Sequence, residues 1–297
     1  MKRVLFIYNR HAGKNKTWAS LSDMINAMVE QNCLVTAYPT QYQGSVGDAV
    51  VRWGKEYDQL VIAGGDGTLS EAISGVRRSG RDLVIGNTLG STNDFSRNLN
   101  LPSDRLTELA ATAVSGVPHT HDLGQFNGKN FLYVAAFGAF ADVAYTTPQK
   151  IKNVLGYNAY ILEGAKSLTS IKPHHIKVEY DDQVLEGDYL YGMVSNTTSV
   201  GGMRNFPPGN PDLSDGLLEV TLIAHIRGVK TVEEFSQALL AGDSVLSSIS
   251  TSFSTPKVKI SSDIGLTWTL DGEAGGTHQV AEIEALHNAY TIVYGAN

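Results

Sequence analysis

The chain has 297 residues, a length that predicts two domains at roughly 150 residues per domain. Hydrophobic residues make up 42% of the chain and charged residues 18%, which is enough apolar material for a large core and excludes general disorder. The net charge of −7 argues against nucleic acid as the main partner, because proteins that bind a phosphate backbone carry a basic excess. Cys33 is the only cysteine, so an internal disulfide and a cysteine-rich metal site are excluded, and a reducing, cytoplasmic location is expected.

The first third of the chain alternates strand and helix patterns. Continuous apolar runs predict buried strands, and apolar residues spaced three and four apart predict helices. The predicted strands are Val4–Tyr8, Leu34–Tyr38, Leu60–Ala63 and Leu83–Ile85; the predicted helices are a segment containing Trp18, Leu21, Ile25 and Met28, then Val46–Trp53 and Leu69–Val76. This alternation predicts an α/β domain with a mostly parallel sheet over residues 1–125.

A different pattern, of short strands separated by turn signals, begins near Phe126 and predicts a mainly antiparallel β-sandwich domain over residues 126–284. The predicted strands are Phe131–Phe137, Ile176–Tyr180, Tyr189–Val194, Leu217–Ile223, Val258–Ile260 and Leu266–Leu270, with helices at about Ala159–Leu168 and Thr231–Leu240. The last apolar run, Tyr290–Tyr294, predicts that about 285–297 returns to complete the first domain. The longest apolar stretch, Phe131 to Tyr145, is broken by Gly138 and Asp142, so no membrane span is expected.

The strongest local signal is Gly64-Gly65-Asp66-Gly67-Thr68, between a predicted strand and a predicted helix. Glycines let the backbone approach a ligand, and the start of the helix offers free N–H groups to an anion, so we favour a phosphate site over a plain capped turn. Two further polar loops follow strands: Asn9-Arg10-His11-Ala12-Gly13-Lys14, and Gly86 to Arg97, for which a loop capped by Asp94 is an equal alternative. Loops at the carboxyl ends of parallel strands meet in one crevice, where α/β sheets bind nucleotides.

Together these loops resemble the catalytic domain of the diacylglycerol kinase family, in its bacterial lipid-kinase branch. Pro211 to Val220 resembles the P-x-x-x-DG-x-x-x-V segment of that family, and Trp268 to Glu273 resembles its late D-G-E motif. The matching motifs keep their order over nearly the whole chain. GGDGT alone is shared with NAD kinases, whereas GGDGT with N-D-F and a late D-G-E is highly specific.

The resemblance implies ATP in a cleft between an α/β domain and a β-sandwich domain, and transfer of its γ-phosphoryl group to a lipid hydroxyl, chiefly that of diacylglycerol. The implied nucleotide-binding residues are Asn9, Arg10, His11, Ala12, Gly13, Lys14, Thr40, Gly64, Gly65, Asp66, Gly67, Thr68, Leu69, Ser70, Glu71, Ser91, Asn93 and Asp94. Asp271 is implied as the general base with Glu273 beside it, and Asp212, Asp215 and the carbonyl of Leu217 as ligands of a structural Mg²⁺. The implied location is cytoplasmic and peripheral to the inner face of the membrane, where the lipid substrate lies.

Several alternatives remain open from sequence. Asp215-Gly216 and Asp271-Gly272, taken singly, are typical of β-turns. Glu163 stands where some active diacylglycerol kinases carry lysine, which leaves open a non-catalytic nucleotide- or lipid-binding protein. A kinase of another lipid or of NAD is the other alternative, and the sequence leaves a homodimer open.

Overall fold

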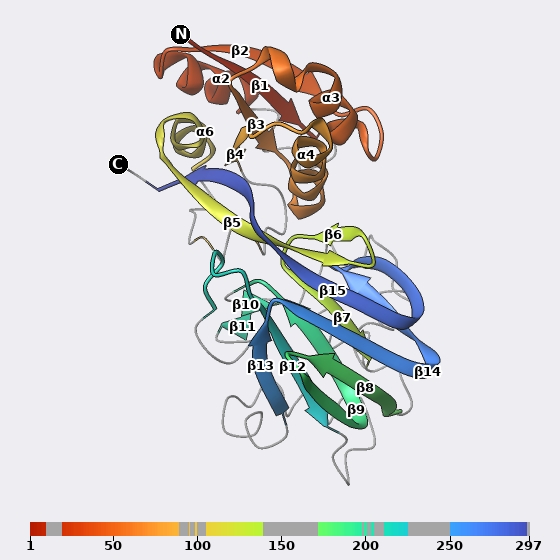
Figure 1. Ribbon diagram of the computed structural model, residues 1–297. Helices are drawn as coiled ribbons and strands as arrows, with labels where there is room; N and C mark the ends of the chain where they lie inside the picture. Colours follow the sequence, from red (N-terminus) through yellow and green to blue (C-terminus); the bar gives the residue numbers. More distant parts are fainter. Residues whose placement is uncertain are drawn as a thin grey trace. The chain divides into compact units, whose positions relative to one another are not determined.

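The structure is a computed structural model that describes residues 1–9, 20–88, 95, 99, 105–138, 172–197, 199–200, 203–204, 211–224 and 250–295. The chain divides into two compact units (Figure 1). Unit 1 comprises Met1–Asp122 and Asn288–Asn297, and unit 2 comprises Leu123–His287.

Unit 1 contains a parallel sheet in the order β4-β3-β1-β2. Its strands are β1 (Lys2–Tyr8), β2 (Cys33–Pro39), β3 (Gln59–Ala63) and β4 (Val84–Thr88). The end of β15 (Glu273–Tyr294) adds a fifth parallel strand beside β4, with Ile292 opposite Ile85. The central strands β1 and β3 are apolar runs because they are buried on both faces, whereas β2 lies at the edge and is partly exposed.

Helices pack in two pairs against this sheet: α2 (Leu21–Glu30) with α6 (Leu106–Ser115), and α3 (Ser45–Trp53) with α4 (Asp66–Ser79) (Figure 1). The first pair contributes Met24, Met28 and Ala110 to a core shared with the β1 side chains Val4 and Phe6. A 3-10 turn (Gly54–Glu56) follows α3. The sequence patterns did not indicate α6.

Helix α4 continues three residues beyond the predicted Val76, to Ser79. Arg77 and Arg78 lie in its last turn, where cations favour the negative end of the helix dipole. Gly80 then adopts a left-handed φ of 66°, and its N–H donates to the carbonyl of Arg77.

Unit 2 is mainly antiparallel, with strands in the order β13-β12-β9-β7-β14-β15, while β8 pairs with β9 and β14, and β5 with β6. The strands are β5 (Val117–Phe126), β6 (Lys129–Phe131), β7 (Val134–Gly138), β8 (His174–Tyr180), β9 (Gln183–Ser195), β12 (Leu218–Ala224), β13 (Ser250–Thr255) and β14 (Lys257–Leu270). Two short strands, β10 (Ser199–Val200) and β11 (Met203–Arg204), pair separately.

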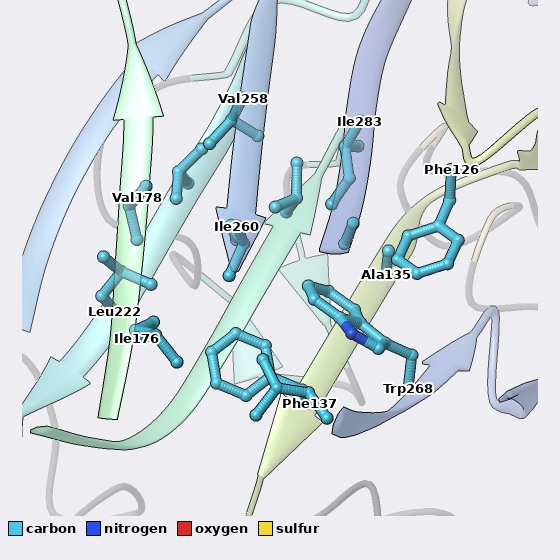
Figure 2. Close-up of a cluster of buried hydrophobic side chains, with 14 of the residues drawn as sticks. Phe126, Ala135, Phe137, Ile176, Val178, Leu222, Val258, Ile260, Trp268 and Ile283 are labelled. Carbon is cyan, nitrogen blue, oxygen red and sulfur yellow. The ribbon is translucent and has the colours of Figure 1, made fainter. Parts of the chain in front are cut away.

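The core of unit 2 is built around the fully buried Trp268 (Figure 2). Its ring centroid lies 4.8 Å from that of Phe126 and 4.9 Å from that of Phe137. Aliphatic side chains from β8, β12 and β14, among them Val178 and Leu222, complete the cluster. Because successive side chains on a strand point to opposite faces, every second residue of these strands faces this core.

Three strand predictions need correction. The apolar run Phe131–Phe137 is two strands, because the amides of Leu132 and Tyr133 leave the ladder and donate to Asp271. The runs Val258–Ile260 and Leu266–Leu270 belong to one strand, β14, which continues through an irregularity after Ser261. Tyr290–Tyr294 is only the end of the 22-residue β15. The helices predicted at about Ala159–Leu168 and Thr231–Leu240 lie outside the described residues.

Candidate active site

The glycine turn between β3 and α4 leaves the start of α4 open. Gly65 is extended, with φ −81° and ψ −177°, and its carbonyl accepts the N–H groups of Thr68 and Leu69 at 2.9 and 3.1 Å. Among the described residues no side chain caps this helix start. N–H groups at a helix start, together with the helix dipole, attract anions, so the geometry suits a phosphate.

The loops after β1, β2 and β3 meet beside this turn. The Asn9 side-chain amide lies 3.3 Å from the Thr68 hydroxyl, and the Asn9 N–H donates to the Ala63 carbonyl at 2.8 Å. The Thr40 N–H donates to the carbonyl of Tyr8 at 2.9 Å. Asn9, Thr40 and Thr68 are therefore gathered at the carboxyl edge of the sheet, as expected for a nucleotide site in an α/β fold.

Glu71 has a structural partner in this region. Its carboxylate accepts the N–H of Gly44 at 2.8 Å, which ties α4 to the loop that precedes α3. Gly64, Asp66, Gly67 and Ser70, also predicted to bind the nucleotide, lie in the glycine turn and the first residues of α4. The predicted residues that lie outside the described part of the chain are Arg10, His11, Ala12, Gly13, Lys14, Ser91, Asn93 and Asp94; Glu163 also lies outside it.

In unit 2, Asp271 and Gly272 form the tight turn between β14 and β15, with φ values of 51° and 80°. The turn expected from a lone Asp-Gly pair is therefore present. The Asp271 carboxylate also reaches across to the β6–β7 connection and accepts three consecutive backbone N–H groups. These belong to Leu132, Tyr133 and Val134, at 2.6, 2.9 and 3.1 Å.

Two features of the surroundings of Asp271 have opposite effects on its pKa. Burial raises the pKa of Asp271 to about 6, while the three backbone hydrogen bonds lower it. A carboxyl that titrates near neutral pH suits acid–base chemistry. However, a carboxylate has about four acceptor positions, and the amides use three of them. Glu273, two residues later, is exposed.

The predicted metal loop precedes β12. The Asp212 carboxylate accepts the N–H and the hydroxyl of Ser214 at 3.0 and 2.8 Å, and Asp215 accepts the N–H of Leu217 at 2.9 Å. Each bond uses the same oxygen, Oδ1, of its carboxylate. Both side chains are exposed, so a second oxygen of each remains accessible.

This loop is connected to the Asp271 turn through Asn196. The Asn196 side-chain amide donates to the carbonyl of Leu213 at 3.5 Å, and its backbone N–H donates to the carbonyl of Tyr133 at 3.0 Å. Tyr133 in turn donates to Asp271. The acidic loop and the Asp271 turn therefore lie at the same end of unit 2.

The oxygen donors of the loop fit a hard cation. Carboxylate and carbonyl oxygens are the ligands that Mg²⁺ prefers, and this ion keeps several waters. In the described part of the chain, no three His, Cys, Asp or Glu side chains gather closely enough to hold a metal. A cation here would thus be held by two carboxylates, the Leu217 carbonyl and water.

Sequence reasoning missed Asn196 and Glu219. Glu219 is a buried carboxyl within the apolar strand β12, and a charge inside such a run was the available signal. Burial raises the pKa of Glu219 to about 7, with a further contribution from the nearby carboxylates of Asp215 and Asp212. Asn196 gave no signal, because its role depends on strands distant in the sequence.

Comparison with known proteins places both halves of the chain. Residues 3–126 match the diacylglycerol kinase catalytic domain, and residues 134–293 match the YegS C-terminal NAD kinase beta sandwich-like domain. This chain belongs to the diacylglycerol kinase family. It is accordingly an ATP-using kinase with an α/β catalytic domain and a β-sandwich domain.

Relatives support this membership over almost the full length. Diacylglycerol kinase of Bacillus subtilis (strain 168) is 30% identical over 280 residues, covering 93% of this chain and 91% of the relative. Diacylglycerol kinase of Staphylococcus saprophyticus is 32% identical over 288 residues, covering 93% and 90%. A crystal structure from Bacillus anthracis str. Sterne shares the fold, with a TM-score of 0.85 at 24% identity, over 99% of this chain and 97% of that one. Among the described residues, no helix has the length and apolarity to cross a membrane.

Proposed function

We propose that this kinase transfers the γ-phosphoryl group of ATP to a lipid hydroxyl, with diacylglycerol as the substrate and phosphatidic acid as the product. The observation that carries the proposal is the uncapped start of α4 after the GGDGT turn, in a chain whose relatives are named diacylglycerol kinases. A lipid substrate requires the protein to act at a membrane surface, which we propose it reaches as a peripheral protein.

The role of unit 1 in this proposal is to bind the ATP phosphates. Phosphoryl transfer depends mainly on positioning and on charge compensation, so fixed N–H donors are the useful groups. The start of α4 offers such donors, and Asn9 and Thr68 stand beside it with side-chain hydrogen-bonding groups. Transfer requires that the nucleotide on unit 1 reach the acidic residues of unit 2.

The role of the acidic loop is to hold Mg²⁺ through Asp212, Asp215 and the Leu217 carbonyl. When bound, this ion would supply positive charge at the loop and stabilise it. The Ser214 and Leu217 donors orient the two carboxylates in advance, which lowers the entropy lost on binding a cation.

The role of the Asp271 turn is general-base chemistry on the lipid hydroxyl. The sequence assigns the base to Asp271, and this assignment stays a prediction. Since three amides already occupy its carboxylate, we propose that Asp271 positions the turn and that the exposed Glu273 accepts the proton.

A phosphate-transfer assay tests the overall function. The protein is incubated with labelled ATP, Mg²⁺ and detergent-solubilised diacylglycerol, a sphingoid base, undecaprenol or phosphatidylglycerol, with NAD in parallel. We expect label in phosphatidic acid. Label on NAD would identify an NAD kinase, and tight ATP binding without transfer to any acceptor would favour a binding protein.

Glu273→Gln decides which carboxylate is the base. We expect turnover to fall by about 10²-fold or more while ATP affinity and melting temperature stay unchanged, because the side chain is exposed and makes no bond in the described structure. Unchanged turnover in this variant would return the role of base to Asp271.

A further inference from the structure

Glu219 is a buried carboxyl that the proposed catalytic steps do not use. Only 7% of its surface is exposed, and its Oε2 atom has no hydrogen-bond partner among the described residues. The neighbouring Ser195 hydroxyl bonds to the main-chain carbonyl of Glu219, at 3.5 Å, and leaves the carboxylate aside. The Glu219 carboxylate accepts a hydrogen bond from its own main-chain N–H, but that leaves Oε2 without a donor. A buried carboxylate oxygen without a hydrogen-bond donor is unfavourable, so a donor such as a bound water fits beside Oε2.

Strand alternation places Glu219 on the face away from the hydrophobic core. Leu218 and Val220 belong to the core cluster of unit 2, so Glu219 between them points to the opposite face. Thr221, also buried, shares that face and accepts the Ser252 hydroxyl at 3.2 Å. The opposite face at β12 is therefore buried and partly polar.

The register places Glu219 at the end of the sheet that carries the Asp271 turn. Glu219 lies opposite Ser195 of β9, and Ser195 lies opposite Val134 of β7. The N–H of Asp271 donates to the carbonyl of Val134 at 2.8 Å. Glu219 and Asp271 thus occupy one row of the sheet, three strand spacings or about 14 Å apart.

Glu219 also lies beside the acidic loop. It follows Leu217 by two residues, at the start of the strand into which the loop bearing the Asp212 and Asp215 carboxylates leads. Both of these charges are negative, so the local field around Glu219 favours a cation. Because no three such side chains gather for direct ligation in the described structure, contact through water is the fitting mode.

We propose that Glu219 is a further residue of the divalent-cation site, accepting a hydrogen bond from a water bound to Mg²⁺ at the Asp212–Leu217 loop. The inference rests on the proposed Mg²⁺ site and extends it by one positioning residue. The buried carboxylate fixes the water and adds negative charge without occupying a ligand position. Outer contacts of this kind typically affect metal affinity by about 10- to 100-fold when removed.

The test measures Mg²⁺ binding by the full-length protein without ATP or lipid. Calorimetric titration gives the Kd, and the rise in melting temperature on adding Mg²⁺ gives an independent reading of binding. In Glu219→Gln we expect a metal-free melting temperature no lower than that of the wild type, and a Kd for Mg²⁺ about 10- to 100-fold weaker. Glu282→Gln is the matched control, since it removes the same charge from an exposed position in unit 2 and should leave the Kd unchanged. Asp215→Asn, which alters the loop itself, should abolish measurable binding.

A second measurement uses the wild type, so it does not depend on a variant folding. Mn²⁺ in place of Mg²⁺ should broaden the backbone NMR signals of Leu217 to Val220 and leave that of Val258 sharp. A wild-type Kd in Glu219→Gln, with binding lost in Asp215→Asn, would overturn the role of Glu219 and leave the loop site intact. Absence of Mg²⁺ binding in the wild type would overturn both metal assignments, while the lipid transfer assay would still judge the kinase function separately.

Discussion

At the residue scale, Asp271 shows how one carboxylate connects two parts of unit 2. Its left-handed φ of 51° closes the β14–β15 turn, and its side chain binds the amides of three successive residues, Leu132 to Val134. Those amides would otherwise lack partners where the run breaks into β6 and β7. The residue is therefore structural as well as adjacent to the proposed chemistry.

Asp271→Asn should therefore lower stability as well as turnover. The asparagine amide group would place N–H donors against backbone N–H donors, so we expect a loss of about 1–3 kcal/mol in the free energy of unfolding. Chemical denaturation of the variant, beside Glu273→Gln, measures this. Equal stability of Asp271→Asn and the wild type would mean that the three hydrogen bonds contribute nothing measurable.

At the element scale, the β3–α4 turn depends on two glycines for different reasons. A Cβ on Gly64 would lie 2.5 Å from the Thr68 side chain, so the helix start can pack here only against glycine. A Cβ on Gly65 would meet no described atom within 4 Å, and its φ of −81° suits any residue. Gly65 therefore leaves open space at the α4 start, where we propose that phosphate binds.

The pair Gly64→Ala and Gly65→Ala separates folding from nucleotide binding. Gly64→Ala should destabilise the protein by about 1–3 kcal/mol through overpacking. Gly65→Ala should keep the wild-type melting temperature while weakening ATP affinity about tenfold or more, because its methyl group occupies the space proposed for phosphate. If Gly65→Ala bound ATP with wild-type affinity, the proposal that phosphate binds beside Gly65 would be wrong.

At the scale of the whole molecule, two strands cross the boundary between the units. β5 leaves unit 1 at Asp122, and β15 enters it at Asn288. These crossing points lie together, because the Asp122 carboxylate accepts the N–H of Asn288 at 2.7 Å. Unit 1 is therefore assembled from both ends of the chain.

A shortened chain tests this assembly. Residues 1–122 joined to 288–297 by a short Gly-Ser linker should fold cooperatively, because the linker spans only a hydrogen-bonded distance. Residues 1–122 alone should be less stable or aggregate, since β4 becomes an edge strand without β15 and Ile85 loses its pairing with Ile292. Thermal melts followed by circular dichroism compare the two; equal stability would show that the last strand of β15 is dispensable.

The sequence by itself determined the features that depend on local pattern. Apolar runs and three-to-four spacing located β1 to β3 and helices α3 and α4, and the GGDGT string marked the turn between β3 and α4. These elements are recognisable because burial periodicity and capping chemistry act over a few neighbouring residues.

Only the tertiary structure decided the features that depend on distant pairing. The chain leaves the ladder between β6 and β7 because the Leu132 N–H there donates to the carboxylate of Asp271, which lies 139 residues further along the chain. Glu219, whose buried Oε2 has no hydrogen-bond partner among the described residues, is in sequence one charge within an apolar run, and only the packing of Leu218 and Val220 in the core shows which face it is on. Such features come from long-range backbone pairing, which no local periodicity encodes, and for that reason the sequence predicted the motifs but not the contacts that hold them.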